Sequence, residues 1–368
     1  MSSNDDEQWL RELGAAKADV GKDEARKRQH AKEELGMLLH LVDHREDAAP
    51  ALAALPPLDV GLHFDVPADR YHNDPCPTPS LSASVAKLVL SSALKGWQAH
   101  PRLGGGLEED EDEPDAPRAR GSIVDQLIFG GGPEIVECDF KDWRKKVAKE
   151  AREEAYARGA LPVLAHKLAK YREAAEAIKA TLTAKLARNG YENVFEMGRS
   201  QVTMIWKSPA GGYRRGRTDY LLLLPDWEAP TSYLILDLKN SYDASPAGAE
   251  RSMNNFDAQI QRASYVDGIE TLFPQLTGRG EMWFMFAEHT PPFDGTINRC
   301  SGEGRELGEH QWRRAGRTWD ECVAKDVWPG YPDTVLDVAP RPYMLQQDEE
   351  QQLIAGGLVS GGSPGITF

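Results

Sequence analysis

Two short apolar runs, each next to an aspartate, constrain the fold of this chain most strongly. Residues 220–224 and 233–236 consist of Leu, Ile and Tyr, and a segment rich in Pro and Asp separates them. Runs of this length with such flanks predict two β-strands joined by a turn, which favours an antiparallel pair. Asp219 would enter the first strand and Asp237 would leave the second. The pattern therefore predicts that the two carboxylates meet.

The sequence Asp-Leu-Lys at 237–239 places charged groups where phosphodiester cleavage needs them. Strand alternation sends Asp237 and Lys239 to one face, while Leu238 points into the core and can lend its carbonyl to a metal ion. Mg²⁺ prefers oxygen ligands and keeps several waters, one of which can act as the nucleophile. Lys239 can orient that water or neutralise charge on the phosphate. Such a triplet is also typical of a solvated ion pair, so its surroundings decide between the two interpretations.

Two further carboxylates lie upstream of this triplet. Glu196 precedes a strand-like segment at 201–207, and Asp125 lies in a helix-like apolar stretch at 121–128. Each is a candidate third or fourth acidic group near a metal ion.

Groups that can contact phosphate oxygens accompany the acidic residues. Gln261 and Tyr265 are four residues apart in a segment, 252–269, that predicts a helix, so they share one helical face. Arg215 and Arg217 precede the first aspartate. We expect these arginines to contact either DNA or the acidic site itself.

The order of these residues resembles the PD-(D/E)xK nuclease superfamily, and within it the RecE-like (exonuclease VIII) and RecB-like branch found in phages and prophages. The resemblance rests on Glu196, on Arg-Thr-Asp at 217–219, on Asp-Leu-Lys at 237–239 and on the Gln-x-x-x-Tyr element that starts at Gln261. Segments at 71–75, 80–84 and 97–103 are similar to the N-terminal part of phage exonucleases of this type. The resemblance covers residues 58–345.

This resemblance implies an α/β restriction-endonuclease-like core, in which helices flank a central mixed sheet, with an N-terminal helical extension. It implies Mg²⁺ or Mn²⁺ as cofactor, and it implies these metal-binding residues: Asp219, Asp237, Leu238 through its carbonyl, Asp125 and Glu196. Lys239 would be the catalytic lysine, acting with Asp219, Asp237 and Glu196. Gln261 and Tyr265 would engage DNA near the scissile phosphate.

One position departs from the family pattern. The family commonly has Gly-x-x-x-His in a helix where this chain has Gly121 followed by Asp125. A carboxylate still suits Mg²⁺ or Mn²⁺. The change leaves the metal preference and the strength of a second metal site open.

The expected function is a metal-dependent exonuclease that resects linear double-stranded DNA in phage-type recombination or repair. Relatives that resect processively often form closed rings and work with a single-strand annealing protein, so a homo-oligomeric ring and such a partner are expected candidates. Two alternatives stay open. One is a structure-dependent or site-specific endonuclease on the same core, and the other is a DNA-binding or interaction protein that has lost cleavage.

Overall charge and hydropathy limit the remaining classes. The formal net charge is -15, which is unusual for a DNA enzyme, but many acids lie in the run at 108–115, which predicts a solvated loop. The basic cluster at 141–149 predicts either a solvated helix face or a local phosphate contact. No apolar run approaches the roughly 20 residues that span a bilayer, and the N-terminus is unlike a signal peptide. We expect a cytoplasmic protein of a bacterial host or phage, without a membrane partner.

Cysteine spacing and glycine motifs exclude several cofactors. Cys76, Cys138, Cys300 and Cys322 are far apart, which argues against a zinc site, a disulfide framework or an iron–sulfur cluster. There is no Gly-x-x-x-x-Gly-Lys-Ser/Thr motif, so ATP is not expected.

The chain is expected to have three parts. Residues 1–57 predict a charged helical arm, residues 58–345 the nuclease domain, and residues 346–368 a flexible C-terminal tail. Within the domain, the apolar spacing predicts helices at 81–94, 142–158, 164–186 and 306–327, and a buried strand at 281–287.

Overall fold

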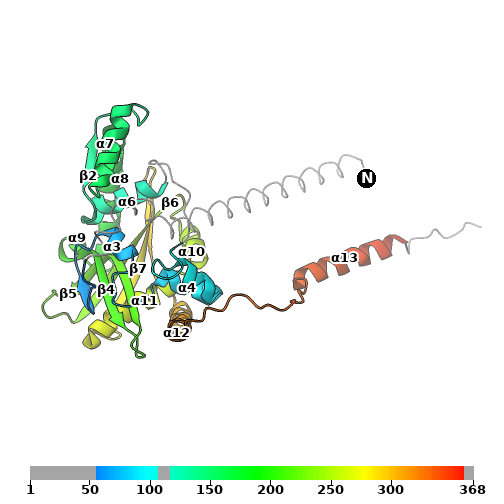
Figure 1. Ribbon diagram of the computed structural model, residues 1–368. Helices are drawn as coiled ribbons and strands as arrows, with labels where there is room; N and C mark the ends of the chain where they lie inside the picture. The colour runs from blue at the N-terminus through cyan, green and yellow to red at the C-terminus, as the bar shows by residue number, and fades with distance from the viewer. Residues whose placement is uncertain (1–54, 107–116, 360–368) are drawn as a thin grey trace, which may run out of the picture. The chain divides into compact units, whose positions relative to one another are not determined.

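A mixed sheet of six strands lies at the centre of the unit that ends at Pro329 (Figure 1). The computed structural model describes residues 55–106 and 117–359. In sheet order, the strands are β1 (Gly61–His63), β4 (Arg199–Lys207), β5 (Tyr213–Leu224), β6 (Ser232–Ser241), β7 (Gly280–Glu288) and β8 (Gly295–Asn298). Neighbouring strands are antiparallel except β6 and β7, which are parallel. The expected α/β architecture with a central mixed sheet is confirmed.

Helices cover both faces of this sheet. The first face packs against α4 (Ala83–Ser91), α11 (Ala258–Leu272) and α12 (Gly302–Lys325), and the second against α6 (Pro117–Phe129) and α8 (Ala165–Arg188). Because successive strand residues point to opposite faces, β6 contributes to both cores: Tyr233 and Ile235 belong to the first core, while Leu234, Leu236 and Leu238 belong to the second.

The shorter elements complete this unit. They are α3 (Ala68–His72), α5 (Ala93–Ala99), α7 (Lys146–Ala157), α9 (Val194–Met197), α10 (Pro246–Asn255) and the 3₁₀ turn η1 (Pro274–Leu276), together with a second sheet of two parallel strands, β2 (Ile135–Cys138) and β3 (Leu161–Leu164). Gly130, Gly131 and Gly132 all have positive φ and connect α6 to β2. In Figure 1, β2 and α7 project beyond the main sheet next to α6.

Several expected helices exist, but two of them are broken. The helix expected at 81–94 ends at Ser91, because Ser92 adopts an extended conformation before α5 begins. The helix expected at 252–269 is interrupted between α10 and α11, where Asp257 adopts a left-handed conformation with φ 48°. Strand β7 confirms the buried strand expected at 281–287.

The sequence predicted a helical arm at the N-terminal end of the chain and a flexible tail at the C-terminal end. Most of the expected N-terminal arm, residues 1–54, lies outside the described residues, as does the acidic run at 108–115. The second unit begins at Gly330 and contains α13 (Pro342–Val359), where the sequence predicted a flexible tail from residue 346. The flexibility of this tail stays a prediction. None of the helices in the described ranges has the length and apolarity needed to span a membrane.

Helix α11 approaches the sheet closely because glycine occurs where the two surfaces touch. A Cβ on Gly216 of β5 would lie 3.1 Å from the ring of Tyr265, and one on Gly268 of α11 would lie 3.1 Å from the ring of Trp206. Close approach of this kind is a usual reason for glycine inside a strand. It brings the polar residues of α11 against the ends of β5 and β6.

We predict that Gly216→Val destabilises the protein by about 1–3 kcal/mol, because its methyl groups overlap Tyr265 and Met204 in a closely packed region. Urea unfolding of the two proteins measures the difference. Gly302→Val is the matched control, since a Cβ at Gly302 meets no atom within 4 Å. Equal unfolding midpoints for Gly216→Val and the wild type would contradict this account of how α11 packs on the sheet.

Candidate functional site

The candidate site forms where β5 and β6 separate. Their ladder ends at the pair Tyr220 and Leu236, so Asp219 and Asp237 flank the last paired residues. Beyond that point, Oδ2 of Asp219 accepts a hydrogen bond of 3.0 Å from the backbone N–H of Leu238. A side chain thereby replaces the next bond of the ladder. This contact holds the carboxylate of Asp219 beside the segment that carries Asp237.

Two donors from different elements hold the carboxylate of Asp237. Nζ of Lys239 lies 2.6 Å from its Oδ2, and Nε2 of Gln261 donates to its Oδ1 at 2.6 Å. Strand alternation places Lys239 on the same side of β6 as Asp237, and α11 supplies Gln261. Only 2% of Asp237 is exposed. The carboxylate is therefore fixed in position and almost removed from solvent.

A third carboxylate reaches this cluster from α6. Nδ2 of Asn240 donates to Oδ1 of Asp125 at 2.8 Å. Burial raises the pKa of Asp125, and the charge of Asp219 adds to the rise. Burial also raises the pKa of Asp219 to about 7, with the charge of Asp237 as the next cause. Burial is the larger cause of both shifts, and repulsion between neighbouring carboxylates adds to it.

Lys239 is the ammonium group at the centre of this cluster. Burial acts against its charged form, but the charges of Asp237 and Asp219 outweigh burial and raise its pKa. Lys239 is therefore a permanent cation at physiological pH. The raised pKa values of Asp219 and Asp125 mean that these buried carboxyl groups tend to hold protons, and a divalent cation is a group that would replace those protons.

Tyr265 and Arg217 border the same cluster. Burial raises the pKa of the Tyr265 phenol, and the charges of Asp237 and Asp219 contribute to the rise. Burial lowers the pKa of Arg217, while Asp219 and Tyr265 are among the groups that oppose the change. Both predicted residues therefore lie beside the carboxylates, but Tyr265 is only 9% exposed.

Tyr71 is a neighbour of the site that the residue spacing did not reveal. The guanidinium of Arg217 lies 5.7 Å from the centre of its ring, within the range of a cation–π contact. Tyr71 belongs to α3, which is distant in sequence from β5, so no local periodicity links the two. Its occurrence in the segment at 71–75, which resembles phage exonucleases, was the available signal.

Arg215 lies over the ring of Tyr71, as Arg217 does, but its hydrogen bonds go to other groups, and its expected contact with DNA or the acidic cluster stays a prediction. Its Nη1 donates to the carbonyl and to the hydroxyl of Ser80, at 2.9 and 2.7 Å, and lies 3.2 Å from Asp74. Arg215 is 4% exposed and Asp74 is 4% exposed. Although burial opposes ionisation of Asp74, Arg215 and His100 hold its pKa well below the usual range. Arg215 is a structural cation.

Glu196 is also not brought to the cluster. It is exposed on α9, and its charge acts on the hydroxyl of Tyr220. Tyr220 packs in the core on the second face of the sheet, whereas Asp237 and Lys239 alternate onto the first. The sequence placed Glu196 correctly before β4, but it could not show on which face of the central sheet α9 would lie. Asp125, rather than Glu196, supplies the third carboxylate.

The donors available to a metal ion are few. In residues 55–106 and 117–359, no three Asp, Glu, His or Cys side chains form a group ready to hold a metal. The donors that remain are Asp219, Asp237 and the backbone carbonyl of Leu238. The N–H and C=O groups of one strand residue point to the same side of the strand, so this carbonyl points, like the Leu238 N–H, toward Asp219. Two carboxylates and one carbonyl fit an ion such as Mg²⁺, which keeps several waters.

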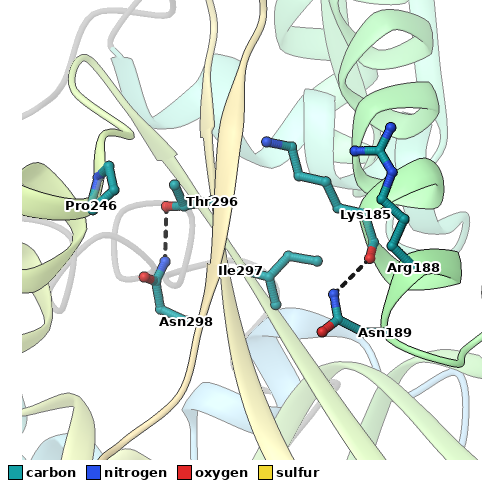
Figure 2. Close-up of a pocket in the computed structure, with 7 residues that line it drawn as sticks. All are labelled: Lys185, Arg188, Asn189, Pro246, Thr296, Ile297 and Asn298. Carbon is teal, nitrogen blue, oxygen red and sulfur yellow. Dashed lines mark hydrogen bonds between the residues drawn. The ribbon is translucent and has the colours of Figure 1, made fainter.

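A separate cavity of about 300 Å³ lies next to β8, the strand at one edge of the sheet (Figure 2). Its lining consists of Lys185, Arg188, Asn189, Pro246, Thr296, Ile297 and Asn298. Strand β7 separates β8, which carries part of this lining, from β6. Lys185 and Arg188 lie in the last turn of α8, where the helix dipole favours cations. Their position is explained by the helix alone, and the cavity is not part of the carboxylate cluster.

Comparison with known proteins yields little. No protein-family model matches the chain, and no curated protein matches it. A solved structure from Eubacterium rectale, described as a "Putative exonuclease", is similar with a TM-score of 0.41 and 16% sequence identity. The match covers 73% of this chain and 92% of that chain. A likeness of this size does not establish a family or an activity, so the geometry of the site carries the argument.

We predict that Arg215→Met destabilises the protein by about 3 kcal/mol, because it leaves the buried charge of Asp74 with weaker partners. This loss of stability is at the lower end of the usual range for breaking a buried ion pair, because His100 and Arg102 remain near Asp74. Denaturant unfolding measures it. The control is Arg313→Met, at an exposed position of α12, which should change stability by less than about 0.5 kcal/mol. If Arg215→Met is as stable as the wild type, the structural role assigned to Arg215 is wrong.

Proposed function

We propose that this chain is a metal-dependent deoxyribonuclease with a PD-(D/E)xK type of core. The observation that carries the proposal is the meeting of Asp219 and Asp237 beside the ammonium of Lys239, where β5 and β6 separate. Hydrolysis of a phosphodiester needs anionic oxygens to hold a divalent ion and a cation to stabilise the phosphate. This arrangement places both kinds of group within hydrogen-bonding reach of each other.

Asp219, Asp237 and the Leu238 carbonyl would hold Mg²⁺ or Mn²⁺, with Asp125 as the neighbouring carboxylate. Such an ion, when bound, lowers the pKa of a coordinated water and offsets negative charge on the phosphate. The raised pKa of Asp219, about 7, supports this assignment. Repulsion among buried carboxylates is the condition that a divalent cation relieves.

The protein's own side chains would bind and orient the substrate. Lys239 can donate to a phosphate oxygen, because it is already held beside Asp237 by an ion pair of 2.6 Å. Gln261 orients the other oxygen of Asp237. Arg217 is the guanidinium nearest the cluster among the predicted DNA contacts, and its Nε has no hydrogen-bond partner within the described residues. Arg217 therefore has donor capacity for a phosphate.

We further propose that the substrate is linear double-stranded DNA, resected from its ends. This finer assignment rests on the order of the motifs in the sequence, and so do the ring-shaped oligomer and the single-strand annealing partner. An endonuclease on the same core is the alternative. The buried position of Asp237 favours a substrate strand that is led into the site rather than one that passes across an open surface.

The purified chain with Mg²⁺ or Mn²⁺ is expected to degrade linear duplex DNA and to leave covalently closed circles intact. Lys239→Ala should lower the rate at least about 100-fold, because it removes a preorganised charge next to the reacting phosphate. Lys325→Ala, at an exposed residue paired with Glu321, is the control and should keep wild-type activity. Gel analysis of both substrates measures the outcome.

Each result of that assay has a separate meaning. Nicking of the circles supports the endonuclease instead. Binding of DNA without any metal-dependent cleavage supports a protein that has lost cleavage. Cleavage that survives in Lys239→Ala at the wild-type rate would overturn the proposed site.

We predict that Mg²⁺ raises the melting temperature of the wild type and not that of Asp219→Asn combined with Asp237→Asn. At a Mg²⁺ concentration 100-fold above the dissociation constant, binding to the folded state adds about 2.7 kcal/mol of stability. Thermal unfolding with and without EDTA measures the shift. Because the double variant leaves the ammonium of Lys239 with weaker partners, its melting temperature in EDTA first verifies that it folds. Asp348→Asn on α13 serves as a control that keeps the shift. A shift that persists in the double variant would place the ion elsewhere.

A further inference from the structure

Residues 130–164, here called the arm, form a small module between α6 and α8. The arm contains the parallel strands β2 and β3 and the helix α7. Its inner side packs on the two flanking helices through Val163, with Ile123 of α6 and Leu168 of α8. Its strands belong to a separate sheet, so the arm contributes no strand to the sheet that carries the carboxylates.

The surface of the arm around the start of α7 is strongly basic. Lys141, Arg144, Lys145, Lys146 and Lys149 are all exposed. Arg144 and Lys146 have 91% and 88% of their side chains exposed, and each has one acidic neighbour. Lys145 and Lys149 form no ion pair in the part of the chain that the structure describes. The protein therefore neutralises only part of the positive charge of this surface.

The position of these cations is unfavourable for the helix that carries them. Lys145 is the N-cap of α7, and Lys146 and Lys149 follow in its first turn. The first turn contains no acidic residue and the last turn no basic residue. A helix dipole favours the opposite arrangement, as in the last turn of α8 with Lys185 and Arg188 (Figure 2). Helix stability explains the cations of α8 but not those of α7.

A second feature of the same surface is an aromatic side chain among the cations. The guanidinium of Arg152 lies 5.7 Å from the ring of Trp143, which packs near Phe140. Ala148 and Ala155 form the buried face of α7, and Arg152 borders that face. The exposed cations are concentrated in the first turn of α7 and in the segment before it, whereas Glu150, Glu153 and Glu154 are exposed farther along the helix.

An anionic polymer is the ligand that fits such a cluster of exposed cations. The chain as a whole carries a formal charge of -15, so it repels nucleic acid except where cations are concentrated. The arm is one such place, and it is joined to α6, the helix that carries Asp125. Successive phosphates of a duplex present repeated negative charges to such a cluster of lysine and arginine side chains.

We propose that the first turn of α7, with the basic segment before it, binds the phosphate backbone of duplex DNA away from the bond that is cut. The identity of the ligand rests on the proposed nuclease function. The contact is electrostatic and independent of base sequence, since lysine and arginine at phosphates position a duplex without reading it. It serves to retain the substrate while the end enters the carboxylate cluster.

The test compares two triple variants of the full-length chain. The arm variant carries Arg144→Gln, Lys145→Gln and Lys149→Gln, and the control variant carries Arg313→Gln, Arg314→Gln and Arg317→Gln at exposed positions of α12. Both remove the same charge. Binding to a fluorescent DNA duplex of about 40 base pairs, or roughly 140 Å at 3.4 Å per base pair, is measured over a range of salt concentrations. EDTA is present, so that cleavage plays no part. Melting temperatures verify that both variants fold.

The arm variant is expected to bind at least about tenfold more weakly than the wild type at low salt, because fewer cations face the phosphates. The slope of log K against log salt should fall by about 0.9 for each phosphate that the variant no longer neutralises, or roughly 2–3 in total. The control variant should keep most of the affinity and the wild-type slope. Equally weakened binding in the two variants, unchanged binding in the arm variant, or no binding of duplex by the wild type would each overturn the proposal.

Failure of the proposed function gives a different result. If the wild type binds the duplex through the arm but never cleaves it with Mg²⁺ or Mn²⁺, the arm assignment stands and the nuclease assignment falls. If cleavage depends on Lys239 while the arm variant binds normally, the nuclease assignment stands and the arm assignment falls.

Discussion

The hydrogen bond from the Leu238 N–H to the Asp219 carboxylate is the contact on which the candidate site depends. It occurs at the first position where the ladder between β5 and β6 is no longer continued. Without a partner there, the strands would separate and the two aspartates would move apart. The bond instead keeps them together and leaves the neighbouring carbonyl directed toward the same gap. Gln261 and Lys239 then fix Asp237 from two other directions, so the geometry of the cluster is set before any ligand binds.

Charge rather than shape distinguishes this cluster from an ordinary buried ion pair. A single carboxylate with a single lysine would be balanced, and the pKa of the acid would fall. Here the pKa values of Asp219 and Asp125 rise instead, because each carboxylate is buried near another. Such an arrangement lowers stability unless a cation offsets it, which is a frequent property of functional sites. The closely packed helix α11, which depends on Gly216 and Gly268, keeps the groups from relaxing away from one another.

The sequence predicted the parts of the site that depend on local periodicity. Alternation along β6 was sufficient to place Asp237 and Lys239 on one face, and helical spacing was sufficient to bring Gln261 and Tyr265 to one side of α11. Local periodicity could not show how distant segments surround these residues. Arg215 and Arg217 are equivalent by alternation, yet Asp74 and Ser80, from a remote loop, bury only the first. The short helix α9 directs Glu196 away from the cluster, and no pattern in the strand that follows it indicates that direction.

The glycine junction at Gly130, Gly131 and Gly132 has a consequence for how this fold can vary. Residues 130–164 leave one helix of the second face and return to another, and they never enter the ladder of the six strands. Lengthening, shortening or exchanging this segment therefore leaves every strand register unchanged. The exposed cations of this segment and the carboxylates of the cluster therefore lie in separable stretches of sequence, and a change in one leaves the other in place.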